Sequence, residues 1–130
     1  MTLADAIRKG AEQLAACRGQ MFVMVGSETI SACALGAALW GLLGPTATRR
    51  EERVALTNHF PALDATVESP CVCPSVRYEY GLRVQDGSKI RGSIGAVIIH
   101  LNDIDRWSRE RIADWLDTLP EEATACPTPS

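Results

Sequence analysis

Hydrophobic positions near the start of the chain recur at the three- and four-residue spacing of a helix. Thr2 can cap a helix, with Asp5 three positions further on, and an apolar stripe then extends from Leu3 to Leu14. Gly19 is a residue type that commonly follows the end of a helix. We therefore predict a first helix that begins at about residue 3 and ends before Gly19.

The next part of the chain is more apolar and has the features of a buried helix. Residues 30–44 contain no charged side chain and are rich in Ala, Leu and Gly. Fifteen helical residues rise about 22 Å, less than the roughly 30 Å of a bilayer core, so we expect no membrane span. We predict a central buried helix from about Ser31 to Leu43. The apolar run at 21–25 fits either a short strand or a buried connection.

The middle of the chain predicts one helix and one hairpin. Thr48 opens a capping-box sequence, which predicts a third helix to about His59. Residues 77–84 alternate between apolar and polar side chains and precede Asp86-Gly87, a pair typical of tight turns. We therefore expect a small β-hairpin around residues 76–92.

Two more helices are predicted in the last third. Residues 94–101 place apolar side chains on one helical face; their β-branched run also favours a strand, and we choose the helix. A second amphipathic helix runs from its predicted cap, Ser108, to Leu119, with Ile112 on the buried stripe and Arg109 on the solvent side.

Together these elements predict a mainly α fold, a compact bundle of four to five short helices with a small hairpin. A chain of 130 residues can bury a core of its own. We assign residues 1–119 to a single globular helical domain and residues 120–130 to a flexible tail.

Charge and cysteine content narrow the classes of function. Thirteen basic against sixteen acidic residues provide no general excess of positive charge, which disfavours a nucleic-acid partner. The helix after Ser108 is similar to the first helix of a helix-turn-helix, but no recognition helix follows it. Five cysteines are an odd number, and no apolar leader precedes them, so we expect free thiols and a cytoplasmic location.

Two segments form motifs. Residues 33–38 read CALGAA, and residues 99–103 read IHLND, followed by WSRERIADWL at 107–116. With these motifs, which cover about a third of the chain, the sequence resembles a family of small bacterial and phage proteins. A cysteine pair spaced by two residues is expected upstream in that family, whereas here one residue separates Cys71 from Cys73. The resemblance implies no particular activity.

The pair Cys71 and Cys73 is a candidate metal site. Thiolates bind zinc, and a structural zinc ion needs four ligands, so His59, His100 or a distant cysteine would have to complete the shell. A labile disulfide between the two cysteines and a pair of ordinary thiols are the alternatives.

Cys33 and a polar cluster offer further chemistry. Cys33 lies near a helix start, where the helix dipole favours a thiolate that could act as a nucleophile with a histidine. The alternative is a small core residue, which its Ala- and Leu-rich surroundings favour.

Downstream, a cation could bind to the cluster that includes His100 and Asp105. We instead expect Asn102 and Asp103 to close a turn on their own backbone, before the helix capped by Ser108.

Because no known catalytic motif is present, we expect a non-enzymatic protein-interaction or regulatory module. Trp is enriched at interfaces, so Trp40, Trp107 and Trp115 are candidate contacts with a protein partner or a second copy in a homodimer. The alternatives are a metal-binding or thiol-active protein that uses Cys71 and Cys73, a small cysteine-dependent enzyme, and a nucleic-acid-binding protein.

Overall fold

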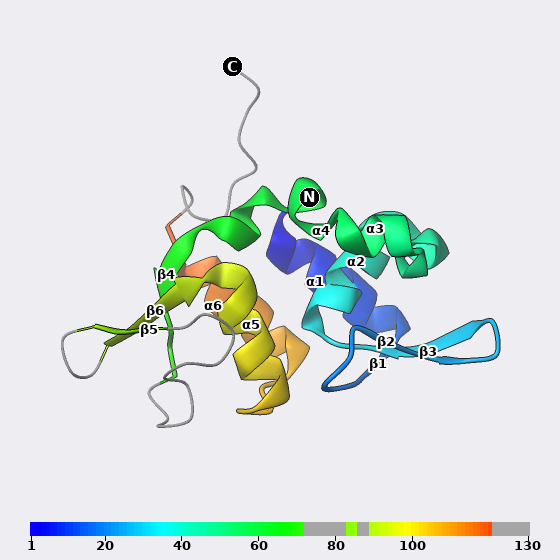
Figure 1. Ribbon diagram of the computed structural model, residues 1–130. Coiled ribbons are helices and arrows are strands. Elements are labelled where there is room, and N and C mark those ends of the chain that lie inside the picture. Colours follow the sequence, from blue (N-terminus) through cyan, green and yellow to red (C-terminus); the bar gives the residue numbers. More distant parts are fainter. Residues whose placement is uncertain (72–82, 86–88, 121–130) are drawn as a thin grey trace, which may run out of the picture.

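The computed structural model describes residues 1–71, 83–85 and 89–120. These residues form six α-helices, two short 3-10 helices and two small three-stranded sheets, with one sheet on each side of the helices (Figure 1). The prediction of a mainly α fold is confirmed. The predicted bundle of four to five helices is corrected, because two sheets rather than one hairpin accompany the helices, and several helices are only one turn long.

The first helix, α1 (Leu3–Gln13), packs against the second, α2 (Ala34–Leu43). The amide of Asp5 donates to Thr2 Oγ1 at 3.1 Å, which confirms the predicted cap. The two helices meet backbone to backbone: a methyl group on Gly10 would overlap the carbonyl of Ala37, and one on Gly41 would overlap the carbonyl of Ala6. Glycine is required at both positions.

The first sheet lies between α1 and α2 in the chain. Its strands β1 (Ala15–Ala16), β3 (Glu28–Ala32) and β2 (Phe22–Val25) are ordered β1-β3-β2, with β1 parallel and β2 antiparallel to β3. The run at 21–25 is therefore mostly strand. The second helix does not begin at Ser31, because Ser31 pairs with both β1 and β2 in the sheet.

The end of the first helix and the start of the second also differ from the prediction. The amide of Gly36 donates to the Cys33 sulfur at 3.4 Å, so Cys33 is the N-cap and α2 begins at the next residue. The first helix ends at Gln13, with Leu14 as its C-cap, rather than near Gly19, which lies in the loop after β1 with φ of 79°.

The predicted third helix, which was to end at about His59, is present as two short α-helices with a 3-10 helix on each side of them. These are η1 (Gly44–Thr48), α3 (Arg50–Val54), α4 (Leu56–His59) and η2 (Pro61–Asp64). Thr48 does not cap a helix, because its hydroxyl donates to the carbonyl of Pro45 at 3.2 Å.

The second sheet contains part of the predicted hairpin and leads into α5 (Ile94–Asp103). Its order is β4 (Thr66–Glu68), β6 (Lys89–Ser93), β5 (Arg83–Gln85), and both pairings are antiparallel. Residues 76–82 and 86–88 of the predicted hairpin, which include its predicted turn, lie outside the described residues, and β4 was not predicted. The helix chosen for residues 94–101 is confirmed.

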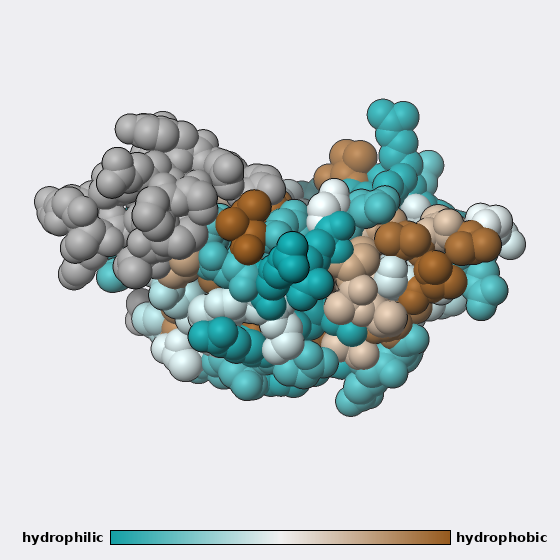
Figure 2. All heavy atoms as spheres, turned by 90° about the horizontal axis from the view of Figure 1, so that it is seen from below, coloured by the Kyte–Doolittle hydropathy of each residue, from teal (hydrophilic) through white to brown (hydrophobic). Residues whose placement is uncertain are grey.

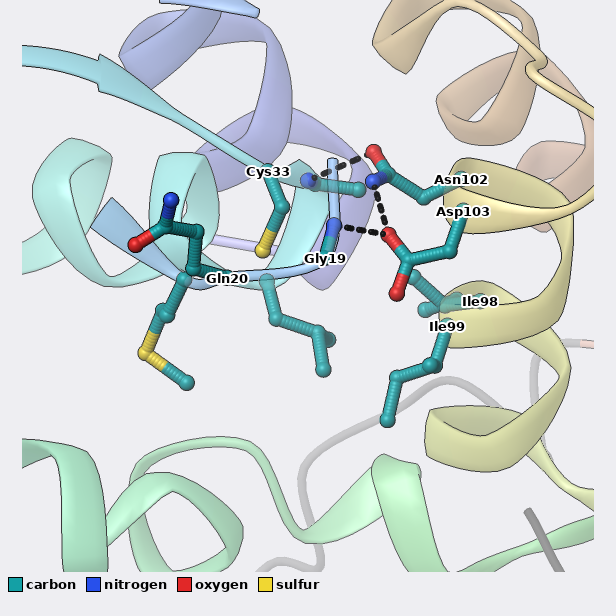
Figure 3. A pocket seen from close by; sticks show the side chains of 10 residues that line it. Gly19, Gln20, Cys33, Ile98, Ile99, Asn102 and Asp103 are labelled. Carbon is teal, nitrogen blue, oxygen red and sulfur yellow. Dashed lines mark hydrogen bonds between the residues drawn. The ribbon is translucent and has the colours of Figure 1, made fainter. Parts of the chain in front are cut away.

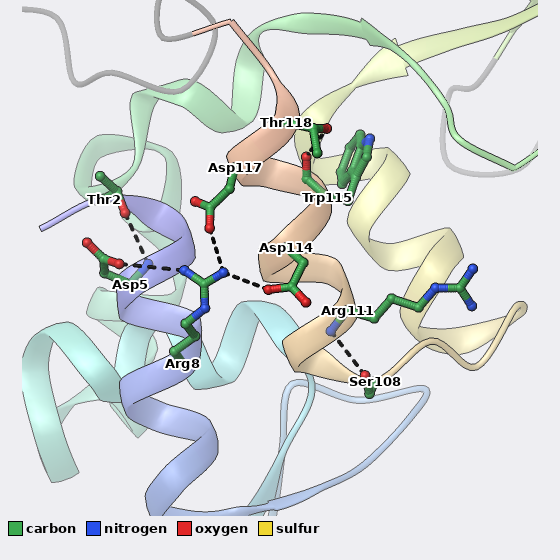
Figure 4. Close-up of polar contacts among 9 residues, drawn as sticks. All are labelled: Thr2, Asp5, Arg8, Ser108, Arg111, Asp114, Trp115, Asp117 and Thr118. Carbon is green, nitrogen blue, oxygen red and sulfur yellow. Dashed lines mark hydrogen bonds and ion pairs between the residues drawn. The ribbon is translucent and has the colours of Figure 1, made fainter.

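The last helix, α6 (Arg109–Thr118), begins at its predicted cap, where the amide of Arg111 donates to Ser108 Oγ at 3.0 Å. It packs against α1, and Arg8 binds Asp114 at 2.9 Å and Asp117 at 2.6 Å (Figure 4). These contacts raise the pKa of Arg8, with Asp117 the larger cause. The predicted tail at 121–130 lies outside the described residues.

Arg109 departs from its predicted solvent position. Its side chain is 7% exposed and donates to the carbonyls of Ala15 at 3.3 Å, Ala32 at 3.4 Å and Ala11 at 3.5 Å. Burial lowers the pKa of this guanidinium. Arg109 therefore joins the start of α6 to the end of α1 and to the first sheet.

One hydrophobic core extends from Leu3 to Leu116. Leu39 of α2 is fully buried in it, as the central-helix prediction requires. Among the described residues, no helix has both the length and the apolar character that crossing a bilayer would need.

Candidate metal centre and neighbouring pocket

The last turn of α5 carries an unusual number of buried polar side chains. His100 is completely buried and Asn102 is 4% exposed. Buried polar groups are costly unless they are hydrogen-bonded, so the contacts of these residues indicate what this part of the molecule does. His100 and Asn102 lead to two different neighbouring sites.

Three potential metal ligands converge at His100. Its Nε2 lies 3.6 Å from the sulfur of Cys71 and 3.3 Å from Oδ2 of Asp105. Cys71, His100 and Asp105 each offer one ligand atom, and these three atoms all lie within 4.8 Å of one another. A thiolate, an imidazole and a carboxylate are the usual protein ligands of zinc.

The second sheet brings Cys71 to α5. Strand β4 pairs with β6, and β6 runs directly into α5, so the residues just after β4 lie beside that helix. Cys71 is held locally because its amide donates to Ser69 Oγ at 3.2 Å.

A sharp turn after α5 brings Asp105 back to the histidine. The amide of Asp105 donates to the carbonyl of His100 at 3.2 Å, and Arg106 follows with φ of 57°. The amide of Trp107 then bonds to the carbonyl of Leu101 at 2.9 Å. These backbone contacts hold the acid next to the ring.

The arrangement favours metal binding over a catalytic relay. In a nucleophile–histidine–acid relay, the nucleophile and the acid contact opposite nitrogens of the ring. Here the sulfur of Cys71 and the carboxylate of Asp105 both lie next to Nε2. Donors gathered around one point are what a metal ion requires, and the described residues supply three of the four ligands of a tetrahedral zinc site.

Of the four residues predicted to form a zinc shell, the structure brings two together. Cys71 and His100 come together, whereas Cys73 lies outside the described residues. His59 is elsewhere, because its Nε2 is paired with Glu52 Oε2 at 2.6 Å. Asp105, placed by sequence in a polar cluster with His100, takes a position that the predicted shell did not include.

Asn102 and Asp103 do not only close a turn on their own backbone. Asn102 Oδ1 accepts from the amide of Ala34 at 3.1 Å, and its Nδ2 donates to the carbonyl of Cys17 at 3.2 Å. Asp103 Oδ1 accepts from the amide of Gly19 at 2.9 Å. The expectation of a local turn is therefore corrected: these side chains connect α5 to the start of α2 and to the loop after β1.

Cys33 is not an activated thiol. Burial raises its pKa from 9.0 to about 11, and the hydrogen bond from Gly36 only partly opposes that rise. Within the described residues, the sulfur of Cys33 bonds to Gly36 and to no histidine. The expectation of a lowered pKa is therefore wrong, because desolvation outweighs the helix dipole.

The three candidate interface tryptophans are all partly buried against the core. Trp40 Nε1 donates to Gln13 Oε1 at 2.8 Å, which connects α2 to α1. The guanidinium of Arg111 lies 3.7 Å from the ring centre of Trp107. Much of each indole surface therefore already has partners within the chain.

Comparison with known proteins adds no assignment, since no family model, curated protein or solved structure matches the chain. The resemblance noted for the two motifs stays a prediction. Functional conclusions rest on the geometry described above.

Proposed function

We propose that this protein binds a zinc-type divalent ion through Cys71, His100 and Asp105. The observation that carries the proposal is the approach of a sulfur and a carboxylate oxygen to one imidazole nitrogen, at 3.6 and 3.3 Å. An ionised thiolate and carboxylate would together balance the two charges of the ion. The histidine is completely buried, so the ion would be shielded from solvent on that side.

The ion would connect two segments that are distant in the sequence. Cys71 follows β4, and His100 and Asp105 lie at the end of α5, so bound metal would fix this end of the helix to the second sheet. Binding to the folded state alone raises the free energy of unfolding by about 2.7 kcal/mol at a free metal concentration of 100 times Kd. We therefore expect a structural or regulatory ion rather than one chosen for catalysis.

The test is metal content and metal-dependent stability. Protein purified without chelator is analysed by native mass spectrometry, and chelator-treated protein is titrated with Zn²⁺ and with Co²⁺. We expect about one ion per chain, a sulfur-to-cobalt charge-transfer band, and a rise in Tm on adding Zn²⁺. Cys71→Ser should abolish the band, and Asp105→Asn should weaken binding at least tenfold.

Two controls separate this site from adventitious binding. Cys17→Ser removes another partly exposed thiol and Asp114→Asn another acid, and neither should alter the titration. A chain that binds no metal would overturn the proposal. So would metal binding that Cys71→Ser leaves unchanged.

Self-association is the second candidate function, and the β2–β3 hairpin favours it. Met24, Val25 and Ile30 are 45%, 64% and 43% exposed, and hydrophobic side chains gather at this end of the molecule (Figure 2). Strand β2 is also an edge strand, which can pair with a second copy.

The test of self-association is light scattering. The mean molecular mass of the wild type should rise with protein concentration, and in Val25→Lys it should return to that of the monomer. A monomeric mass throughout the micromolar range would rule this candidate out.

A further inference from the structure

A pocket of about 310 Å³ lies beside α5, and Asn102 is among the residues that line it (Figure 3). Its wall is formed by the loop after β1, the first residues of α2 and the last two turns of α5. Most of the lining is apolar, with Met21, Leu35, Ile98 and Ile99 as the large side chains. The volume is at the lower end of the range of about 300–1,000 Å³ that is typical of small-molecule sites.

The walls of the pocket are fixed by buried contacts. The loop is held against α2 so closely that a methyl group on Gly36 would overlap the carbonyl of Met21. Asn102 then joins both parts of the wall to α5 through Ala34 and Cys17. A cavity with such walls does not need to be assembled by its ligand.

Of the described residues that line the pocket, Asp103 alone has a side chain that carries a charge at neutral pH. Its Oδ1 accepts from two neutral donors, the amide of Gly19 at 2.9 Å and Asn102 Nδ2 at 2.8 Å. No Lys, Arg or His of the described residues forms an ion pair with it. Figure 3 shows its second oxygen directed toward the cavity, where the sulfur of Cys33 also points.

The start of α2 does not make this pocket an anion site. Two of the amides that a helix N-terminus would offer are already occupied, that of Ala34 by Asn102 and that of Gly36 by Cys33. A phosphate or carboxylate would also meet the negative charge of Asp103. A cation avoids both obstacles.

From this geometry we propose that the pocket binds a small organic ammonium ion, an amine attached to a compact apolar group. The ammonium donates to the free side of the Asp103 carboxylate, and the apolar group contacts Leu35, Ile98 and Ile99. The pocket also lies where the two motifs of the sequence meet, since residues 33–35 belong to one and residues 102–103 to the other. This site shares α5 with the metal centre but none of its ligands, so either proposal can fail alone.

The test compares three probes of equal chain length that differ in charge. Hexylammonium, hexan-1-ol and hexanoate are titrated separately into the full chain, and amide chemical shifts are followed by NMR. We expect hexylammonium to shift the signals of residues 19–21, 33–35 and 98–103. Hexan-1-ol should bind at least tenfold more weakly, and hexanoate should not bind at the pocket.

Two variants test whether the negative charge of Asp103 is responsible for binding of the ammonium ion. Asp103→Asn keeps an acceptor for the Gly19 amide and should weaken hexylammonium binding at least tenfold without affecting hexan-1-ol, whereas the control Asp114→Asn should change neither. Ile99→Lys places an ammonium one helical turn before Asp103 and should block hexylammonium while the chain stays folded. The proposal would be overturned if all three probes bound with equal affinity or if none of them shifted the signals at the pocket. It would also be overturned if Asp103→Asn and Ile99→Lys both bound hexylammonium as tightly as the wild type does.

Discussion

Helices α2 and α5 are of equal length and both are buried, but they are buried in different ways. The buried residues of α2 are all apolar or glycine, and Gly41, together with Gly10 of α1, allows the two helix backbones to lie against each other. Helix α5 buries His100 and Asn102 in addition to its apolar residues. Apolar burial needs only shape, whereas a buried polar side chain needs a specific partner. The contrast indicates that α2 secures the fold, whereas α5 holds the side chains of both candidate sites.

The contact between α1 and α2 should be the most sensitive part of the molecule. In Gly41→Ala the new methyl group would overlap the carbonyl of Ala6, so the helices must move apart. We expect a loss of about 3 kcal/mol or more in the free energy of unfolding, measured with urea. Gly95→Ala on α5 is the matched control: its nearest neighbour would be at an ordinary 3.5 Å, so the variant should gain about 0.5–1 kcal/mol from helix propensity. Equal effects at the two positions would contradict the contrast.

Removing the amide of Asn102 should have the next largest effect. Asn102→Ala leaves the amide of Ala34 and the carbonyl of Cys17 without their partner in a buried region. Unsatisfied buried groups cost about 1–3 kcal/mol each, and we expect a total loss of about 2–4 kcal/mol in urea unfolding. Asn58→Ala, at an exposed position, should change stability by less than about 0.5 kcal/mol. A similarly small effect at Asn102 would mean that water replaces its contacts.

Cys33 provides a smaller, pH-dependent effect. Its pKa is raised in the folded state to about 11, so the folded state retains this proton more strongly than the unfolded state does. The resulting stabilisation is present below about pH 9 and is lost as the pH rises toward 11. In Cys33→Ser, which keeps a capping oxygen and does not ionise in this range, that loss should be absent.

The measurement is the difference in urea unfolding free energy between wild type and Cys33→Ser at several pH values from 8 to 11. The lysines and tyrosines are common to both proteins, so their ionisation largely cancels in the difference. A difference that does not vary with pH would show that the thiol ionises as readily in the folded state as in the unfolded state.

Features that depend on residues close together in the sequence were predicted better than features that depend on distant segments. Two helix starts with a local cap were predicted, at Thr2 and at Ser108, because the cap and its amide are three residues apart. The equally local cap at Cys33 was missed, because cysteine is not among the usual capping residues. Residues 28–32 were misassigned in part, because the strand depends on pairing with β1 and β2. Thr48 was wrongly predicted to cap a helix. Its hydroxyl instead donates to the carbonyl of Pro45 within the 3-10 helix η1.

The candidate sites show the same limit. Cys71 and His100 were named from residue type alone, but only the pairing of β4 with β6 brings them together. His59 has the right chemistry and the wrong position. Arg109 looks like any charged residue in the first turn of a helix, and its three carbonyl partners belong to segments that lie far from it in the sequence. The pocket has no local signal, because its wall comes from three separate segments.

The ion pairs of Arg8 have a consequence for the protein as it is synthesised. They join residues that are 106 and 109 positions apart, between the first helix and the last. The nascent chain can pair α1 with α2 once residue 43 has left the ribosome, but the face of α1 that α6 covers stays exposed until residue 118 has also emerged. During that interval, this face is open to chaperones and to other nascent chains.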